Sequence, residues 1–467
     1  MGFVFYDTET TGLDPAFDQI VQFAAIRTDD KLNPVDKLAV KSRLMPHVLP
    51  SPDALCVTGA SIDELCLADR PSFLEMMCGI YKALLAWSPS TFIGYNSARF
   101  DERFLHHGFY QTLHPAYLTS RHNNARGDAL RLARAVHALR PDLLRAATGP
   151  DGAAGFRLQD ICAANGFRLE VSHEAVGDVE ATLWLCRLIA ERAPDVWSYF
   201  SRFAYKASAR TFLQEEAEAV ILVDPRRNDA GIRVVAWLGS GGDQDANLQF
   251  CVDLAADMMA LRQLQPEDLI AAVSGPDPPI RRVRINRSPM MLPLFELENL
   301  DGFGSEDHYL KQAADLRADP DFVARLLAAA RAAVPAYPLS PHVESQLYAR
   351  FATNEDERIM AAFHNAEWPA RLEIVRQFRD ERFVRLGYRQ IFFERPDLLD
   401  EKTRAEMQTA VARRHTSASD GDVPWTTIAA ARSRIDVMLA AGSNSAALLE
   451  RYRLYLASYQ QAAELRC

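Results

Sequence analysis

Hydrophobic and polar positions divide the chain into three zones. In the first, up to about residue 190, short apolar runs alternate with segments whose apolar residues recur at helical spacing. Strands are expected at 3–7, 20–29 and 91–96, and helices at 73–87, 98–110, 128–139 and 175–193. Because strands alternate with helices, the pattern predicts an α/β layer in which helices flank a mixed sheet.

The spacing of apolar residues changes in the second zone. Short strand-like runs separated by turn residues lie at 219–225, 231–239, 247–255 and 281–294, which is typical of a small antiparallel barrel or sheet. A helical stretch (305–335) and the turn-rich segment VPAYPLSPH (334–342) follow, and from 343 to 467 the pattern is helical throughout. We therefore expect three domains, at 1–193, 194–338 and 339–467.

The composition is that of a folded, soluble protein. Of 467 residues, 48% are hydrophobic and 24% charged, which excludes wholesale disorder. No run of about 18 apolar residues occurs, so no membrane span is expected. The start MGFVFYDTET lacks the basic region of a secretory signal, and a cytoplasmic location is expected. Seven cysteines without a CxxC pair predict reduced core thiols rather than a disulfide framework or a zinc site.

The net charge of −10 excludes a wholly cationic coat but not a nucleic-acid ligand, because local clusters of basic residues decide that question. One such cluster comprises Arg281, Arg282, Arg284 and Arg287. A solvated face is the alternative interpretation of such a run.

Acidic residues stand at the ends of the expected strands and in one helix. Asp7 and Glu9 follow the first strand, and residues two apart in a strand project to one face, so both carboxylates can converge. Asp101 follows the strand at 91–96, and Asp178 lies on the helix at 175–193, five residues after His173. Each of these acids alone is commonplace on protein surfaces.

Together, the pattern D-x-E, then D after G-Y-N-x-x-R-F, then H-x-x-x-x-D resembles the DnaQ-like 3′→5′ exonucleases, in the subgroup with a histidine before the last aspartate. The resemblance implies a ribonuclease H-like fold. Asp7, Glu9, Asp101 and Asp178 supply oxygen donors for two Mg²⁺ ions, with Mn²⁺ as an alternative. Four clustered carboxylates would repel one another without cations. His173, with an ordinary pKa near ~6.5, is the candidate general base.

Further stretches are similar to the bacterial exodeoxyribonuclease I family, among them FRLQDICAANG (156–166), RVRINRSPMMLPL (282–294) and SQLYARF (345–351). This family implies an exonuclease domain, a Src-homology-like β-barrel domain with accessory helices, and an all-α C-terminal domain. It also implies processive 3′→5′ degradation of single-stranded DNA to 5′-mononucleotides, in DNA repair and recombination. The implied partner is the single-stranded DNA-binding protein, through its acidic C-terminal tail. A monomer is our default expectation.

The same resemblance nominates contacts for the DNA. Arg157 matches a substrate-contacting arginine, and Glu9 is placed to meet the 3′-hydroxyl of the terminal nucleotide. The remaining candidates for DNA binding are Arg134, Arg140, Arg126, Tyr117, Arg284 and Arg287. His106 and His107 are weaker candidates. Tyr348 is either a further DNA contact or part of the core, and we favour the core. Arginines can follow phosphates and aromatic rings can stack on bases without sequence preference.

Two alternatives stay open. A 3′→5′ exoribonuclease or a proofreading-type exonuclease would use the same fold, although the roughly 270 residues beyond the first domain favour the DNA exonuclease. The other alternative is a catalytically inactive nucleic-acid-binding scaffold, against which the intact set of carboxylates argues.

Overall fold

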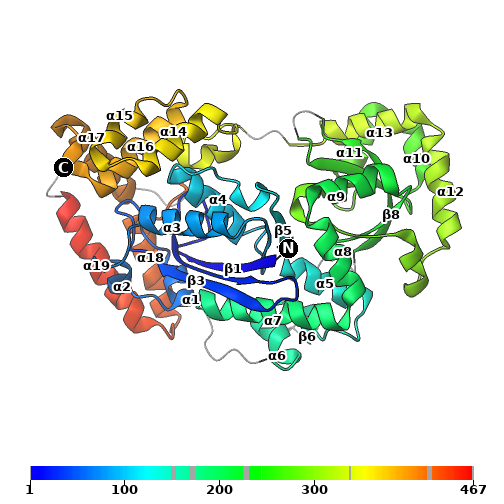
Figure 1. The fold of residues 1–467 in the computed structure, drawn as a ribbon, viewed down its shortest axis with the longest axis horizontal. Helices are drawn as coiled ribbons and strands as arrows, with labels where there is room; N and C mark the ends of the chain where they lie inside the picture. The colour runs from blue at the N-terminus through cyan, green and yellow to red at the C-terminus, as the bar shows by residue number, and fades with distance from the viewer. Residues whose placement is uncertain are drawn as a thin grey trace.

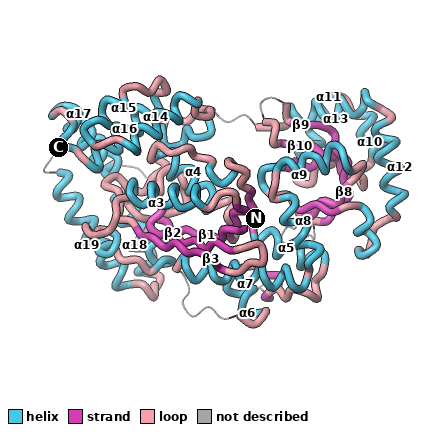
Figure 2. The backbone as a smooth tube through the Cα atoms, viewed as in Figure 1, coloured by secondary structure: helices cyan, strands magenta, loops and turns pink. Residues whose placement is uncertain are grey.

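The computed structural model describes residues 2–148, 154–167, 174–224, 231–242, 245–335, 338–417 and 423–464. Figure 1 shows an elongated molecule, with a first sheet near its centre, a second sheet at one end and the helices α14 to α17 at the other. Figure 2 shows that strands are confined to the centre and one end, whereas helices occur throughout.

The strands are β1 (Gly2–Thr10), β2 (Ile20–Thr28), β3 (Pro34–Lys41), β4 (Ser90–Gly94), β5 (Ala125–Asp128), β6 (Ala147–Thr148), β7 (Ala154–Gly155), β8 (Val220–Val223), β9 (Ile232–Ser240), β10 (Leu248–Asp253), β11 (Ile280–Arg284) and β12 (Met290–Leu292). The first ten helices are α1 (Pro52–Thr58), α2 (Ile62–Leu65), α3 (Phe73–Ala86), α4 (Asp101–Gln111), α5 (Ala129–Leu139), α6 (Leu158–Ala164), α7 (Ala175–Arg192), α8 (Pro194–Phe203), α9 (Lys206–Thr211) and α10 (Met258–Gln263).

The later helices are α11 (Pro266–Ser274), α12 (Glu306–Arg317), α13 (Pro320–Ala332), α14 (Asn354–Asn365), α15 (Trp368–Val375), α16 (Glu381–Glu394), α17 (Glu401–Thr416), α18 (Ile428–Ala440) and α19 (Ala446–Glu464). Short helical turns occur at η1 (Leu118–Ser120), η2 (Phe212–Glu216), η3 (Ile285–Arg287), η4 (Leu294–Asn299), η5 (Val343–Tyr348) and η6 (Pro396–Leu398).

The first sheet is mixed and has the strand order β3-β2-β1-β4-β5. Strand β1 pairs antiparallel with β2 and parallel with β4, and β4 pairs parallel with β5. The pairing of β1 with β4 covers only Gly2–Phe5, whereas its pairing with β2 extends to Thr10. The second half of β1 therefore projects beyond β4, and this is where Asp7 and Glu9 stand.

Alternation along β1 sorts its side chains between two helical layers. Phe3 and Phe5 join the hydrophobic cluster that contains buried residues of α5 and α7. Val4 and Tyr6 join a second cluster with buried residues of α3 and α4. Successive side chains of a strand point to opposite faces, so Asp7 and Glu9 continue the face that α7 covers, and Thr8 continues the face of α4.

The second sheet is antiparallel and has the order β11-β10-β9-β8-β12. One face contributes Ile221, Val234 and Phe250 to the same continuous cluster as the first sheet. The other face packs Val235 and Cys251 with residues of α8 and α9. A shared core therefore joins the second sheet to the nuclease-like layer.

The helical part of the chain packs against the first layer in two places. Buried residues of α14 and α16 form a cluster with Tyr110 and Leu113. Helices α18 and α19 instead cover α1 and α2, where the Tyr452 hydroxyl donates a hydrogen bond of 2.8 Å to the carbonyl of Pro50. The end of the described chain thus returns to the first layer (Figure 1). The expected domain boundaries stay predictions.

Where the elements differ from expectation, local chemistry gives the reason. Strand β3 was not expected, because PVDKLAVK is an edge strand whose side chains are mostly exposed and of which only Leu38 and Val40 pack against the core. The expected strand 281–294 is two strands, separated by η3 and by Ser288, whose φ is +47°. The expected helix 305–335 is also two, because Asp319 caps a new helix that begins at Pro320.

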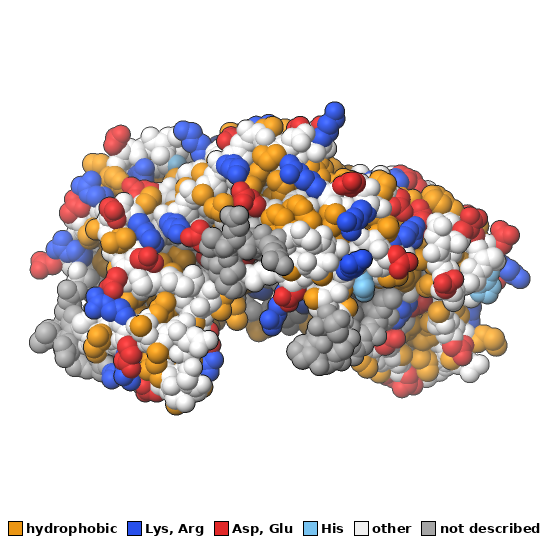
Figure 3. All heavy atoms as spheres, turned by 90° about the horizontal axis from the view of Figure 1, so that it is seen from below, with side chains coloured by type: hydrophobic (Ala, Val, Ile, Leu, Met, Phe, Trp, Pro, Cys, Tyr) orange, Lys and Arg blue, Asp and Glu red, His pale blue; other side chains and the backbone are white. Residues whose placement is uncertain are grey.

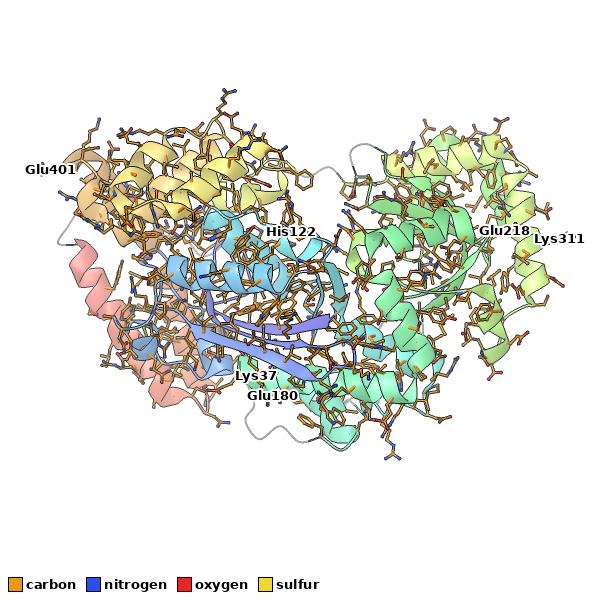
Figure 4. All side chains as sticks on the ribbon, viewed as in Figure 1. Lys37, His122, Glu180, Glu218, Lys311 and Glu401 are labelled. Atoms are coloured by element: carbon orange, nitrogen blue, oxygen red, sulfur yellow. The ribbon has the colours of Figure 1, made fainter. Side chains whose placement is uncertain are left out.

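Charges of both signs are interspersed on the surface shown in Figure 3, as the overall composition suggests. One example of such pairing is Lys37 on β3 with Glu180 on α7, whose side chains lie 3.0 Å apart (Figure 4). In the described part of the chain, no helix is both long and apolar enough to cross a bilayer. Of the described cysteines, Cys162, Cys186 and Cys251 are buried, and Cys66 is exposed.

Candidate active site

Three carboxylates meet where β1 passes the first turn of α7. Oxygen atoms of Asp7, Glu9 and Asp178 lie within 4.8 Å of one another. The strand brings Asp7 and Glu9 to one face because they are two residues apart. Asp178 comes from the first turn of α7, where the positive end of the helix dipole favours a negative charge. The predicted convergence of these three acids is what the structure shows.

The fourth acid, Asp101, is held beside this set by Thr8. The backbone amide and the hydroxyl of Thr8 donate hydrogen bonds of 3.0 and 2.7 Å to Oδ1 of Asp101, which is buried as the first residue of α4. Asp101 is outside the group of three whose oxygens lie within 4.8 Å, but its charge acts on both Asp7 and Glu9. It therefore borders the same site from the α4 side.

The loop that leads to Asp101 is fixed by another acid. Asp128, at the N-terminus of α5, accepts hydrogen bonds from the amides of Asn96 and Ala98 at 3.0 and 3.2 Å. Asn96 has a φ of +61°, a left-handed conformation that asparagine tolerates. Sequence reasoning missed this role of Asp128. The segment GYN (94–96), which precedes Asp101, was a signal for the turn that Asp128 holds.

Burial and repulsion by neighbouring carboxylates raise the pKa values of Asp7, Glu9 and Asp101. Desolvation is the main cause for Asp7, whose pKa lies well above its ordinary value, and the charges of Asp101, Glu9 and Asp178 add to it. Desolvation, Asp178 and Asp101 raise the pKa of Glu9 to about 8. The pKa of Asp101 rises to about 6 through desolvation, although the Thr8 hydrogen bonds oppose the shift. Such a set favours either protons or cations.

The predicted base, His173, lies outside the described residues. The described chain resumes at Glu174, which caps α7. The donor set of the other four residues consists of carboxylate oxygens, which suits Mg²⁺ or Mn²⁺ better than zinc.

Two of the predicted DNA contacts lie close together. Arg157 is exposed and precedes α6. Arg134 on α5 lies over the ring of Phe156, with its guanidinium carbon 5.7 Å from the ring centroid. The Tyr95 hydroxyl holds this loop through a hydrogen bond of 2.6 Å to the carbonyl of Phe156. Both arginines thus border the segment between β7 and α6.

Two other predicted contacts have partners within the protein. Arg140 pairs with Asp195 and Glu296 at 3.1 and 3.2 Å. Arg126 pairs with Glu102 and donates to the carbonyl of Asn286, and burial lowers its pKa to about 10. These contacts join the first layer to α8, η3 and η4. That both arginines contact DNA stays a prediction.

His106 and His107 also differ from expectation. Both are buried, and desolvation is the main cause that lowers their pKa values to about 3 and about 4. The Nδ1 atom of His107 lies 3.1 Å from the carbonyl oxygen of Glu344, and the ring of His106 packs against Tyr117. Neutral, buried imidazoles are poor contacts for phosphate, so both histidines belong to the packing between α4 and its neighbours.

Exposed aromatic residues and arginines gather beyond these histidines. Tyr348 is 54% exposed and Phe351 is 77% exposed. Burial raises the pKa of the Tyr348 hydroxyl, and the charges of Arg103 and Arg287 oppose the shift, so both guanidinium groups lie near it. We call Arg103, Arg287, Tyr348 and Phe351 the aromatic–arginine patch. The assignment of Tyr348 to the core is therefore wrong.

The other predicted residues lie around this patch. Tyr117 contacts Phe351 edge-on, with ring centroids 5.5 Å apart. Arg284 pairs with Asp245 at 2.7 Å. Arg287 is exposed, and its carbonyl accepts a hydrogen bond of 3.0 Å from Arg131. Sequence reasoning missed Arg103 and Phe351. A signal for Phe351 was its position three residues after Tyr348, because residues at this spacing can lie on one side of a helical turn.

Comparison with known proteins agrees with this geometry. The RNase_T family model, described as Exonuclease, matches residues 4–185, which contain all four carboxylates. The chain is 29% identical over 377 residues to exodeoxyribonuclease I of Escherichia coli K12, covering 77% of this chain and 78% of the relative. It is 29% identical over 410 residues to the Haemophilus influenzae protein of the same name, covering 82% and 84%.

Solved structures match over nearly the whole chain. The structure of E. coli exonuclease I in complex with a dA16 oligonucleotide superposes with a TM-score of 0.85 at 25% identity, covering 98% of this chain and 99% of that one. Two further structures, an SSB/exonuclease I complex with an inhibitor and a zinc-bound E. coli exonuclease I–ssDNA complex, have TM-scores of 0.82 and 0.83 at 25% identity, each covering 98% of this chain and 99% of that one.

The fold and the carboxylate site define a metal-dependent exonuclease, a hydrolase of phosphodiester bonds. The E. coli exonuclease I structure matches the second sheet and the helical region as well as the first layer. The similarity is therefore to one kind of exonuclease over nearly the whole chain, and not to the nuclease layer alone. The chain is similar to exodeoxyribonuclease I over most of its length. The predicted fold class, a ribonuclease H-like layer followed by a β-barrel-like unit and a helical region, is confirmed.

Proposed function

We propose that the chain degrades single-stranded DNA processively from its 3′ end to 5′-mononucleotides, and that it serves DNA repair and recombination. The observation that carries the proposal is the convergence of Asp7, Glu9 and Asp178 within 4.8 Å, with Asp101 at the border of the set. The support for DNA as the substrate is that relatives named exodeoxyribonuclease I match most of the chain.

The four carboxylates are proposed to hold two Mg²⁺ ions, with Mn²⁺ as the alternative. When bound, such cations neutralise charge on the phosphodiester and lower the pKa of a water molecule. The raised pKa of Glu9, about 8, means that cation binding at neutral pH releases a proton from this group. Thr8 keeps Asp101 oriented toward the site through its two hydrogen bonds.

His173 is proposed to remove the proton from the attacking water, because an imidazole titrates near ~6.5 and immediately precedes α7. Glu9 is proposed to accept a hydrogen bond from the 3′-hydroxyl of the terminal nucleotide. Arg157 and Arg134, which border the loop before α6, are proposed to contact the phosphates next to the scissile bond.

The aromatic–arginine patch is proposed to grip the strand farther from the site. Its residues come from α4, from η3, and from the end of η5 and the segment after it, so the nuclease layer, the region of the second sheet and the helical region all contribute. Exposed rings stack on bases without sequence preference, and arginines neutralise phosphates. A strand held by three regions at once dissociates slowly, which supports processive action by a single copy of the chain.

The single-stranded DNA-binding protein is proposed as a partner, through its acidic tail. The support is the SSB/exonuclease I structure, which resembles this chain over 98% of its length. A cytoplasmic setting is part of the same proposal.

The test is substitution of Asp178 by alanine. Hydrolysis of single-stranded DNA should fall to background, while binding of the same oligonucleotide should change less than about tenfold, because the phosphate contacts remain. Asp268→Ala, at an exposed position on α11, is the control and should leave both unchanged. Hydrolysis that survives in Asp178→Ala would contradict the assignment of the site.

A further inference from the structure

A second cluster of metal-ligand side chains lies away from the carboxylates, where the helical region meets the nuclease layer. It comprises Cys78 on α3, His114 just after α4, and His364 on α14. One potential ligand atom from each lies within 4.8 Å of the other two. Cysteine and histidine are the ligands that zinc prefers, in contrast to the oxygen donors of the active site.

The hydrogen bonds of the two imidazoles fix which nitrogen is free to bind. The Nε2 atom of His364 lies 3.0 Å from the carbonyl oxygen of Leu113, which only accepts, so Nε2 carries the proton and Nδ1 presents a lone pair. That Nδ1 atom is 3.5 Å from the sulfur of Cys78. A ligand histidine whose other nitrogen donates to a carbonyl is the usual arrangement at metal centres.

His114 follows the same logic. Its Nδ1 atom lies 3.1 Å from the hydroxyl oxygen of Thr112. That hydroxyl donates its one hydrogen to the carbonyl of Gly108 at 2.7 Å, so it accepts from His114. Nδ1 of His114 therefore carries the proton, and its Nε2 presents a lone pair. The structure orients both tautomers as metal ligands require.

Burial keeps both imidazoles uncharged. Desolvation lowers the pKa of His114 well below its ordinary value and that of His364 to about 4. Their rings stack with centroids 3.8 Å apart, an arrangement that suits neutral rings. Burial raises the pKa of the Cys78 thiol to about 11. The charge of Arg371 opposes this shift, whereas the carboxylates of Glu394 and Glu75 add to it.

We propose that Cys78, His114 and His364 bind a zinc ion that fastens α14 to the nuclease layer. Cys78 binds as the thiolate and gives up its proton on metal binding. Among the described residues no fourth side chain joins the set, so solvent completes the tetrahedron. The spacing of the cysteines gave no sign of this site, because its ligands come from three distant segments. The site is independent of the function proposed above.

Cobalt(II) is the probe, because a thiolate bound to Co²⁺ gives a charge-transfer absorption that carboxylates do not. The full chain, stripped with a chelator, is titrated with Co²⁺ and then with Zn²⁺. We expect one equivalent of Co²⁺ to produce the absorption and one equivalent of Zn²⁺ to remove it. The absorption should vanish in Cys78→Ser and persist in Cys66→Ser, whose cysteine is exposed.

His364→Gln provides a second variant in case Cys78→Ser does not fold, with circular dichroism as the check. It should weaken Zn²⁺ binding at least tenfold, as judged by competition with a chromophoric chelator. Zn²⁺ should also raise the midpoint of thermal unfolding in Asp178→Asn, but not when Cys78→Ser is added to Asp178→Asn. Absence of the absorption in the wild type, or its persistence in Cys78→Ser, would overturn the proposal and leave a simple thiol–imidazole hydrogen bond.

Discussion

Thr8 donates two hydrogen bonds to the same oxygen of Asp101, one from its amide and one from its hydroxyl, at 3.0 and 2.7 Å. Thr8 stands between Asp7 and Glu9 on β1, yet its side chain points to the opposite face of the sheet. Strand β1 therefore presents the carboxylates of Asp7 and Glu9 on one face, and on the other face it holds Asp101 through Thr8. Asp101 therefore lies at the site although it belongs to α4 and not to β1.

Replacing Thr8 with valine removes the hydroxyl hydrogen bond and retains the shape. Because that bond stabilises the ionised form of Asp101, its pKa of about 6 should rise further. The acid limb of the pH–activity profile should move to higher pH, and turnover at pH 7 should fall about tenfold or more, since hydrogen bonds to charged groups contribute ~1.5–3 kcal/mol.

The matched control is Thr10→Val on the same strand, which loses a hydroxyl hydrogen bond of 2.7 Å to the carbonyl of Gly12. It should leave the pH profile in place. An unchanged acid limb in Thr8→Val, in a variant that folds normally, would show that Asp101 takes no part in the chemistry.

Glu9→Gln should stabilise the metal-free protein at alkaline pH. The pKa of Glu9 is raised to about 8, so the folded state holds a proton that the unfolded state loses near pH ~4.3. Stability from this group is present at low pH and is lost as pH rises toward 8. The unfolding midpoint of Glu9→Gln should therefore exceed that of the wild type by an amount that grows between pH ~6.5 and ~8, to about 2–4 °C or more.

The buried histidines are the same in the wild type and in Glu9→Gln, so their contribution to the pH dependence cancels in the difference between the two midpoints. Mg²⁺ should cancel or reverse the difference, because it binds the ionised site. Glu180→Gln, at the exposed ion pair with Lys37, is the control and should show a midpoint difference that does not vary with pH. A gap that shrinks with rising pH would contradict the raised pKa of Glu9.

Arg157→Ala should weaken DNA binding by removing one phosphate contact. The slope of log affinity against log salt should decrease by about 0.7, the value for one phosphate of a single strand. Arg379→Ala removes another exposed arginine, which lies between α15 and α16 and pairs with Glu355, and should leave the slope unchanged. If both variants bind and turn over like the wild type, Arg157 is not a substrate contact.

Tyr348→Ala should weaken binding of oligonucleotides long enough to reach the aromatic–arginine patch. Loss of one base stack costs about 1–3 kcal/mol, or roughly 5- to 150-fold in affinity. Tyr348→Phe retains the ring and should bind nearly as the wild type does. Phe295→Ala removes another exposed ring, outside the patch, as the control. Equal losses in Tyr348→Ala and Tyr348→Phe would assign the effect to the hydroxyl rather than to stacking.

Local patterns predicted the parts of the fold and site that depend on one segment. The expected helix 175–193 and strand 20–29 are α7 and β2 almost to the residue, because the buried residues of α7 recur at helical spacing and β2 is a nearly continuous apolar run. The convergence of Asp7 with Glu9 follows from strand alternation alone. That Asp178 joins them depended on the motif, since no local pattern states which helix covers which strand.

What the sequence could not predict are contacts between distant segments. The partners of Arg140 lie on α8 and in η4, and only the folded chain reveals that its charge is already paired. The aromatic–arginine patch likewise needs three regions to meet. For Tyr348 the sequence allowed a DNA contact or a core position, with the core preferred, and its exposed side chain excludes the core position.

The most direct test of the central claim is digestion of 3′-labelled and 5′-labelled single strands of one sequence, as DNA and as RNA, with and without Mg²⁺. The account predicts that mononucleotides leave the 3′ end of the DNA only when Mg²⁺ is present, and that Asp178→Ala releases none. Release from the RNA in preference would retain the fold and the metal chemistry but contradict the proposed substrate. No release from either strand, with binding retained, would contradict the assignment as a nuclease.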